Sequence, residues 1–196
     1  MKIVKRVAIG LGVVVALFVV IGFLLPGTYH VERSVVVNGP ADAIYTHIST
    51  LRHWPEWTAW TLKKYPDMKI DFKGPEDTVG AQYTWTGEQS GAGKLTLTSA
   101  DPNKGIGYDL DFENGQYLST GMIVLEPTGE QVKVTWSNDG NLGMNPVNRY
   151  FGLLMDSFMG PDFEEGLSNL KRRVEAEKAA PPAAGSPNEA ATPDNG

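Results

Sequence analysis

Short segments with alternating apolar side chains fill the middle of this 196-residue chain, and they constrain its fold more than any other feature. Alternation at every second residue is the pattern of a strand with one buried face. Glycine, proline and asparagine separate the segments closely enough for hairpins. Six segments follow one another at about 68–72, 81–86, 95–98, 108–112, 116–125 and 132–137. They predict an antiparallel meander, and residues 31–37 predict one further strand at its start.

Helical spacing replaces this alternation near the C-terminal end. From Pro146 to about residue 178, apolar side chains recur every three or four positions, and Gly160-Pro161 is expected to break or kink the helix. Two shorter helical segments, about 40–50 and 51–60, follow the first strand. A sheet with one apolar face needs a cover. The predicted class is therefore α+β, with a long C-terminal helix packed on about seven antiparallel strands.

The N-terminal segment carries a different signal. Residues Val7 to Leu25 contain no charged or polar side chain. As a helix they span about 28 Å, close to the roughly 30 Å of a bilayer core. The run is longer than the apolar core of a cleaved signal peptide, and no small-residue cleavage site follows it. We expect an uncleaved transmembrane signal anchor at 7–25; a cleaved signal is the alternative.

Charge along the chain predicts its orientation and organisation. Lys2, Lys5 and Arg6 precede the apolar run, so the positive-inside rule places residues 1–6 in the cytoplasm and the domain outside it. That location is the periplasm if the cell is Gram-negative. A single domain is expected at 28–178. The last residues, 179–196, are rich in proline, alanine and glycine and predict a disordered tail.

Composition excludes several classes of protein and site. The chain has no cysteine and a net charge of -6, so it lacks thiolate ligands and the basic surface that nucleic-acid binding requires. Its three histidines, His30, His47 and His53, have no zinc-site spacing. No metal, no cofactor and no nucleic-acid partner is expected.

Three stretches give this order of elements a likeness to a known superfamily. They are residues 31–37 (VERSVVV) with 40–45 (PADAIY), residues 51–57 (LRHWPEW) and residues 159–171 (MGPDFEEGLSNLK). The domain resembles the helix-grip superfamily of START-type lipid-transfer domains, birch-pollen-allergen-like proteins and polyketide cyclases. It is most similar to bacterial polyketide cyclase/dehydrase-like SRPBCC proteins. The resemblance implies a curved sheet that grips the C-terminal helix around an apolar cavity.

Aromatic and methionine side chains are the candidate ligand-binding residues. Three tryptophans recur every third residue on a short helix, and the others face the sheet–helix interior by strand or helix parity. Such side chains suit the wall of an apolar cavity, and equally an ordinary core. The candidates are Trp54, Trp57, Trp60, Tyr83, Trp85, Tyr108, Phe112, Trp136, Met155, Phe158 and Met159.

Three functions remain open at this stage. The favoured one is a membrane-tethered domain that binds a hydrophobic or amphipathic, lipid-like small molecule. A protein-interaction or stress-response module without a ligand is the second, and a cyclase- or dehydratase-like enzyme is the third. An enzyme needs an ionisable side chain inside the cavity, for which His53, Asp156 and Glu88 are the candidates. The sequence assigns no catalytic residue, and it identifies neither the ligand, a protein partner nor the oligomeric state.

Overall fold

The computed structural model describes residues 2–179, and its elements confirm the predicted class. Met1 and the predicted tail, apart from Ala179, lie outside these residues. The elements in chain order are α1 (Lys2–Leu24), β1 (Thr28–Val37), α2 (Ala41–Ser49), the 3₁₀ turn η1 (Leu51–His53), α3 (Trp54–Trp57), β2 (Lys69–Lys73), β3 (Gln82–Gly87), β4 (Gly91–Asp101), β5 (Gly105–Phe112), β6 (Tyr117–Thr128), β7 (Gln131–Asn141), α4 (Pro146–Gly152) and α5 (Met155–Ala179).

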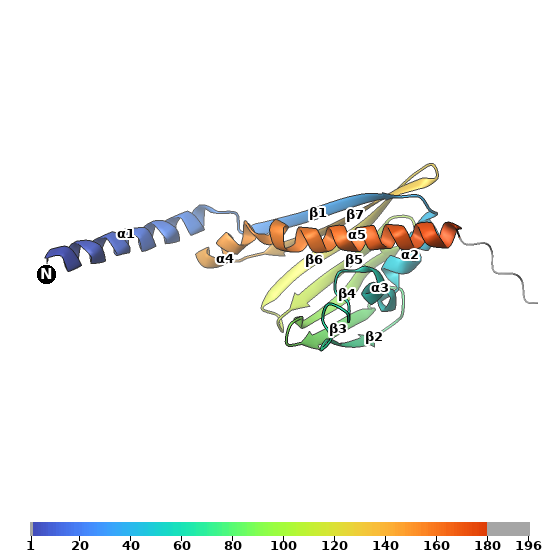
Figure 1. The fold of residues 1–196 in the computed structure, drawn as a ribbon, viewed down its shortest axis with the longest axis horizontal. Coiled ribbons are helices and arrows are strands. Elements are labelled where there is room, and N and C mark those ends of the chain that lie inside the picture. The colour runs from blue at the N-terminus through green and yellow to red at the C-terminus, as the bar shows by residue number, and fades with distance from the viewer. Residues whose placement is uncertain (1, 180–196) are drawn as a thin grey trace, which may run out of the picture.

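One curved antiparallel sheet contains all seven strands in the order β1-β7-β6-β5-β4-β3-β2. Strands β2 to β7 pair in chain order, each with the next. The first strand of the chain, β1, pairs with the last, β7, where Val35 lies opposite Val134. Helix α5 lies across one face of this sheet (Figure 1), so the structure is the expected helix grip.

Strand parity decides which side chains fill the space under α5. On β7, Val132, Val134 and Trp136 are buried, and the residues between them point to the other face. Helix α5 presents buried residues at helical spacing, among them Phe163 and Leu170. The core therefore lies between the sheet and α5, and the short helices α2 and α3 close it from the side.

Three aromatic rings on the inner face of the sheet lie against a glycine on the neighbouring strand. The register pairs Tyr29 with Gly140, Trp85 with Gly93, and Tyr108 with Gly121. A Cβ atom on any of the three glycines would overlap the partner ring. The missing side chains thus let large rings lie close to the strands, which is aromatic rescue of a strand glycine.

The C-terminal helical region is divided differently from the prediction. Asn145 caps α4 by accepting a hydrogen bond from Val147 N (2.9 Å). The break falls after Gly152, where Leu153 and Leu154 bond back only three residues. Helix α5 then runs through Gly160 and Pro161 without ending, so a break at that dipeptide is wrong, and a kink there stays a prediction.

Arg33 of β1 bridges the two sides of Pro161 in α5. Its guanidinium contacts Asp156 by two hydrogen bonds (2.7 and 3.0 Å) and Glu164 by a third (2.6 Å). These residues lie on either side of the proline, each about one helical turn from Gly160, which faces the guanidinium. One bidentate fork thus holds both halves of the helix to β1.

Helix α1 projects from the domain as a separate rod (Figure 1). Among residues 2–179, it is the helix long and apolar enough to cross a membrane, and a signal sequence has the same character. Its side chains are exposed except at Gly22.

The glycine–aromatic pairs predict a large effect for a small change. In Gly121→Val the new side chain would overlap the Tyr108 ring, and such overpacking costs about 1–3 kcal/mol. We expect a clear fall in melting temperature, measured by circular dichroism of the full chain in detergent. Thr120→Val changes the adjacent, outward-facing residue and should leave the melting temperature nearly unchanged. Equal falls in the melting temperature of the two variants would contradict the pairing argument.

Candidate functional site

Trp136 occupies the centre of the interior. Its ring stacks on Phe163 of α5, with centroids 4.2 Å apart and planes 5° from parallel. Trp54 and Trp57 contact the same ring at centroid distances of 5.9 and 5.3 Å, and Trp60 at 6.2 Å. Trp54, Trp57, Trp136 and Phe163 are buried, so these four rings fill the middle of the interior; we call this the closed half, and half-buried Trp60 lies at its edge.

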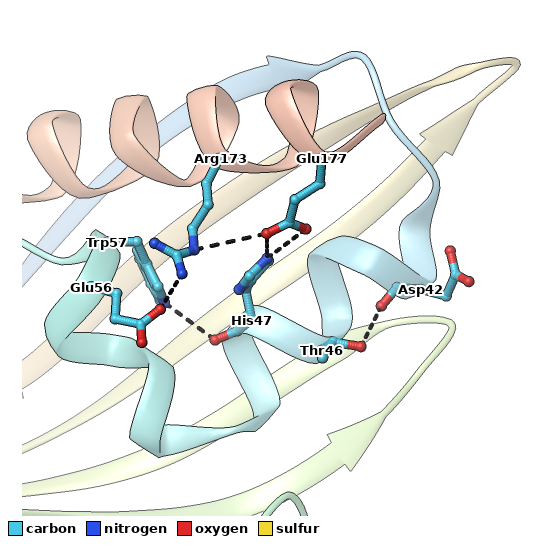
Figure 2. A network of polar contacts seen from close by, with 7 residues as sticks. All are labelled: Asp42, Thr46, His47, Glu56, Trp57, Arg173 and Glu177. Atoms are coloured by element: carbon cyan, nitrogen blue, oxygen red, sulfur yellow. Dashed lines mark hydrogen bonds and ion pairs between the residues drawn. The ribbon is translucent and has the colours of Figure 1, made fainter. Parts of the chain in front are cut away.

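Polar contacts fasten α2 and α3 to α5 beside the closed half (Figure 2). The His47 Nε2 atom lies 3.1 Å from each Glu177 carboxylate oxygen, and Arg173 bonds Glu56 of α3. The Trp57 indole donates to the His47 carbonyl oxygen (3.2 Å). Since these residues belong to three helices, the C-terminal part of α5 is held by both α2 and α3.

Half-buried side chains mark the other part of the interior, which we call the open half. They pack against the core yet keep exposed surface, and they come from β1, β3, β5, α5 and the loop after α3. The set comprises Tyr29, Trp60, Trp85, Leu110, Met155 and Met159. Phe112, also half-buried, joins it through Trp85, with ring centroids 6.3 Å apart. Tyr29 precedes Arg33 by four strand residues, about 13 Å, so it lies level with the junction of α4 and α5.

A chain of polar groups lies on the inner face of the sheet at this level. The Tyr29 hydroxyl donates to Oδ1 of Asn138 (3.0 Å), whose Nδ2 donates to Oγ of Ser119 (3.2 Å). Asn138 has no exposed surface. Sequence reasoning missed both Asn138 and Ser119, although each has the inward parity of its strand. An apolar interior with a few convergent polar groups is the usual form of a small-molecule site.

The tyrosine hydroxyls of the interior stay protonated at neutral pH. Burial raises the pKa of Tyr83 and of Tyr108 to about 12, and it also raises the pKa of Tyr29. Tyr108 accepts a hydrogen bond from the Trp136 indole nitrogen (2.8 Å). These hydroxyls can donate to a carbonyl, carboxylate or hydroxyl of a ligand, but they are poor general bases.

The residues considered for acid–base chemistry lie elsewhere. Asp156 is exposed, and its hydrogen bonds to Arg33 lower the pKa of its carboxyl. His53 lies beside His47, with ring centroids 5.4 Å apart. Within residues 2–179, no three histidine, aspartate or glutamate side chains gather as they would around a metal ion.

Two hollows are found in the described residues. The larger, about 990 Å³, is lined mainly by residues of the helix-free face of the sheet, among them Lys94, Asp109 and Asp139, and it also touches Tyr29, Leu110 and Ser119. In it His30 Nδ1 lies 2.8 Å from Asp139 Oδ1. The smaller, about 30 Å³, lies between η1 and the β2–β3 connection. Neither is lined by any of the eleven predicted ligand-binding residues.

The structure places ten of the eleven predicted residues in the interior, divided between the buried core and the open half. Five are buried in the core: Trp54, Trp57, Tyr83, Tyr108 and Trp136. Five others are half-buried in the open half: Trp60, Trp85, Phe112, Met155 and Met159. Phe158 is 60% exposed on the outer side of α5 and is not brought to them. Their role in binding stays a prediction.

Comparison with known families agrees with this architecture. The model of the family described as polyketide cyclase/dehydrase and lipid transport matches residues 28–175. The chain belongs to this family. The match begins at the first residue of β1 and ends within α5, so it covers the helix grip and leaves α1 outside. The resemblance seen in the sequence is confirmed, whereas no curated protein matches the chain.

Solved structures share the fold of this cyclase/dehydrase and lipid transport domain at low identity. Norcoclaurine synthase from Thalictrum flavum, in complex with dopamine and hydroxybenzaldehyde, is 17% identical at a TM-score of 0.56, covering 80% of this chain and 91% of its own. A hypothetical protein from Helicobacter pylori is 8% identical at 0.57, covering 74% and 87%. The di-domain ARO/CYC StfQ of the steffimycin biosynthetic pathway is 15% identical at 0.57, covering 78% of this chain and 52% of its own, about half its length.

The buried tyrosines predict a loss of stability in alkaline solution. A pKa raised from 10.0 to about 12 means that folded Tyr108 keeps its proton while the unfolded residue loses it, so stability falls as the pH rises through this window. Each pKa unit is worth about 1.4 kcal/mol. Between about pH 9 and pH 12, the free energy of unfolding should therefore fall by on the order of 2 kcal/mol less in Tyr108→Phe than in the wild type. Urea unfolding of the full chain at both pH values measures this difference. Tyr117→Phe, at an exposed tyrosine, should follow the wild type; a Tyr108→Phe curve parallel to both would refute the assignment.

Proposed function

We propose that this chain is a membrane-tethered domain that binds a hydrophobic or amphipathic, lipid-like small molecule in the open half. Residues 7–25 form the anchor, residues 1–6 are cytoplasmic, and residues 28–178 form the exported binding domain. If the cell is Gram-negative, the domain lies in the periplasm. The positive charges before α1 support this orientation.

The observation that carries the proposal is the combination of apolar walls and a polar end in the open half. Trp85, Phe112 and Met159 are half-buried and so offer apolar surface. Beside them the chain of Tyr29, Asn138 and Ser119 provides hydrogen-bonding groups for a polar head. Such an arrangement matches an amphipathic molecule better than a purely apolar or purely polar one.

Entry of a ligand requires side chains to move, and the ones in the way are adaptable. Met155 and Met159 come from the first two turns of α5 and lie over the open half. Methionine has three rotatable bonds and a polarisable sulfur, so it adjusts to ligands of different shape. We infer that these two residues swing aside while the closed half keeps its packing.

Binding is favoured over catalysis by the chemistry of the interior. Tyr29, Tyr83 and Tyr108 have raised pKa values, which suits hydrogen-bond donation but not proton abstraction at neutral pH. The family description includes lipid transport. Norcoclaurine synthase holds dopamine and hydroxybenzaldehyde in its structure, which supports the use of this fold for small aromatic ligands with polar groups.

The test compares bound lipid among three forms of the full chain purified in mild detergent. Native mass spectrometry and organic extraction should find a reproducible adduct on the wild type. Met159→Lys places a charge in the open half and should lose it, whereas Val79→Lys, at an exposed residue of the β2–β3 connection, should keep it. Lipid attached to α1 is common to all three, so only the difference reports on the interior.

Two results would contradict the proposal. One is a bare wild-type chain that also fails to take up fatty acid or phospholipid added in detergent. The other is an equal adduct on Met159→Lys and on the wild type. Thermal unfolding of both variants shows whether the domain is intact.

A further inference from the structure

Helix α4 packs along the last two turns of α1. The Tyr150 ring stacks on Phe18, with centroids 4.3 Å apart and planes 6° from parallel, and its hydroxyl donates to the Phe18 carbonyl oxygen (2.7 Å). Arg149 donates to the carbonyl oxygens of Phe23 (2.9 Å) and Leu25 (3.1 Å). The guanidinium thus caps carbonyls that the end of α1 leaves without helical partners.

Gly22 permits this close approach. It is the buried residue of α1, and a Cβ atom there would lie 2.7 Å from the Pro146 Cβ and 3.0 Å from the Tyr150 ring. By contrast, nothing lies within 4 Å of the Cβ position at Gly12. The contact between α1 and α4 is therefore specific to one face and one level of the apolar helix.

The level of the contact falls inside the apolar run. Phe18 precedes Leu24 by six helical residues, about 9 Å along the axis. Amphipathic helices that lie in a membrane interface bury their apolar face by about 5–10 Å. Tyr150 has the amphipathic ring that such a depth favours.

Exposed apolar side chains surround this contact. Six of them lie between residues 144 and 158, and their exposed fractions range from 46% to 76%. They are Met144, Val147, Phe151, Leu153, Leu154 and Phe158, which we call the docking face. They make up half of the twelve exposed large apolar residues found between residues 25 and 179. Within residues 142–155 the one charged side chain is Arg149, although the chain as a whole is acidic.

We propose that the docking face lies in the lipid of the same membrane that α1 crosses, at the boundary between headgroups and acyl chains. The proposal rests on the membrane anchor of the proposed function. A lipid bilayer is the partner that the structure indicates, because the docking face is continuous with α1 and α4 lies at the end of the domain from which α1 projects (Figure 1). An exposed apolar patch of this kind in water would be a liability.

This placement also determines that the open half faces the bilayer. Met155 and Met159 pack inward, whereas Phe158 on the same two turns of α5, and Leu154 just before them, belong to the docking face. Docking therefore holds the open half next to the bilayer. An amphipathic ligand would reach Tyr29 from the lipid without crossing the surrounding water.

The absence of cysteine from the sequence makes a single-cysteine experiment direct. Phe151→Cys, Leu154→Cys and Phe158→Cys each carry a polarity-sensitive fluorophore in the full chain, reconstituted in phosphatidylcholine vesicles. Part of the lipid bears a nitroxide near the top of its acyl chain. Leu17→Cys reports on α1, and Val36→Cys and Val79→Cys, exposed residues far from α1, serve as controls.

We expect nitroxide to quench the three docking-face sites and Leu17, but neither control. Quenching at Leu17 alone would overturn docking and leave the anchor standing. No quenching at Leu17 would overturn the anchor and the docking with it. Equal quenching at the controls would show general adsorption of the domain and would also overturn the proposal.

A second comparison tests the α1–α4 contact itself. Gly22→Leu should push α4 from α1 and reduce quenching at Phe151→Cys at least twofold, whereas Gly12→Leu should not. Both changes lie in α1, so the fold of the domain is spared. Unchanged quenching in Gly22→Leu would show that α4 enters lipid without this contact and would overturn the docking geometry.

Discussion

The stack of Trp136 on Phe163 is the contact on which the rest of the interior depends. It joins the centre of β7 to the middle of α5, and Trp54 and Trp57 surround the same ring. A buried aromatic cluster contributes both apolar area and preferred ring geometry. Because its rings come from the sheet, α3 and α5, their packing fixes where α5 crosses the sheet and leaves less freedom there than at either end of the helix.

Both ends of α5 are held by ion pairs that water screens. Beyond the cluster, His47, Glu56 and Arg173 tie the helix to α2 and α3. Before it, Arg33 ties the helix to β1. The buried residues of α5 begin only at Gly160, so its first turns are the part of the interior most able to adjust. They are also the turns that carry Met155 and Met159.

Periodicity and parity were enough to predict the sheet, its helix cover and most inward-facing residues, because both follow from local geometry. Features that depend on register or on tertiary contact were not accessible. Gly121 matters only because the register sets it opposite Tyr108, and Phe158 shares its helical spacing with core residues although it faces outward. The break after Gly152, rather than at Pro161, follows from contacts made by α1 and by Arg33.

The first two turns of α5 thus face the interior of the domain on one side and the proposed lipid on the other. A ligand that displaced Met155 or Met159 would disturb residues whose neighbours, Leu154 and Phe158, belong to the docking face. Packed helices transmit such shifts because interiors have little empty space. Ligand occupancy and the depth of the docking face are then linked quantities, and by thermodynamic reciprocity each must change the other by the same free energy.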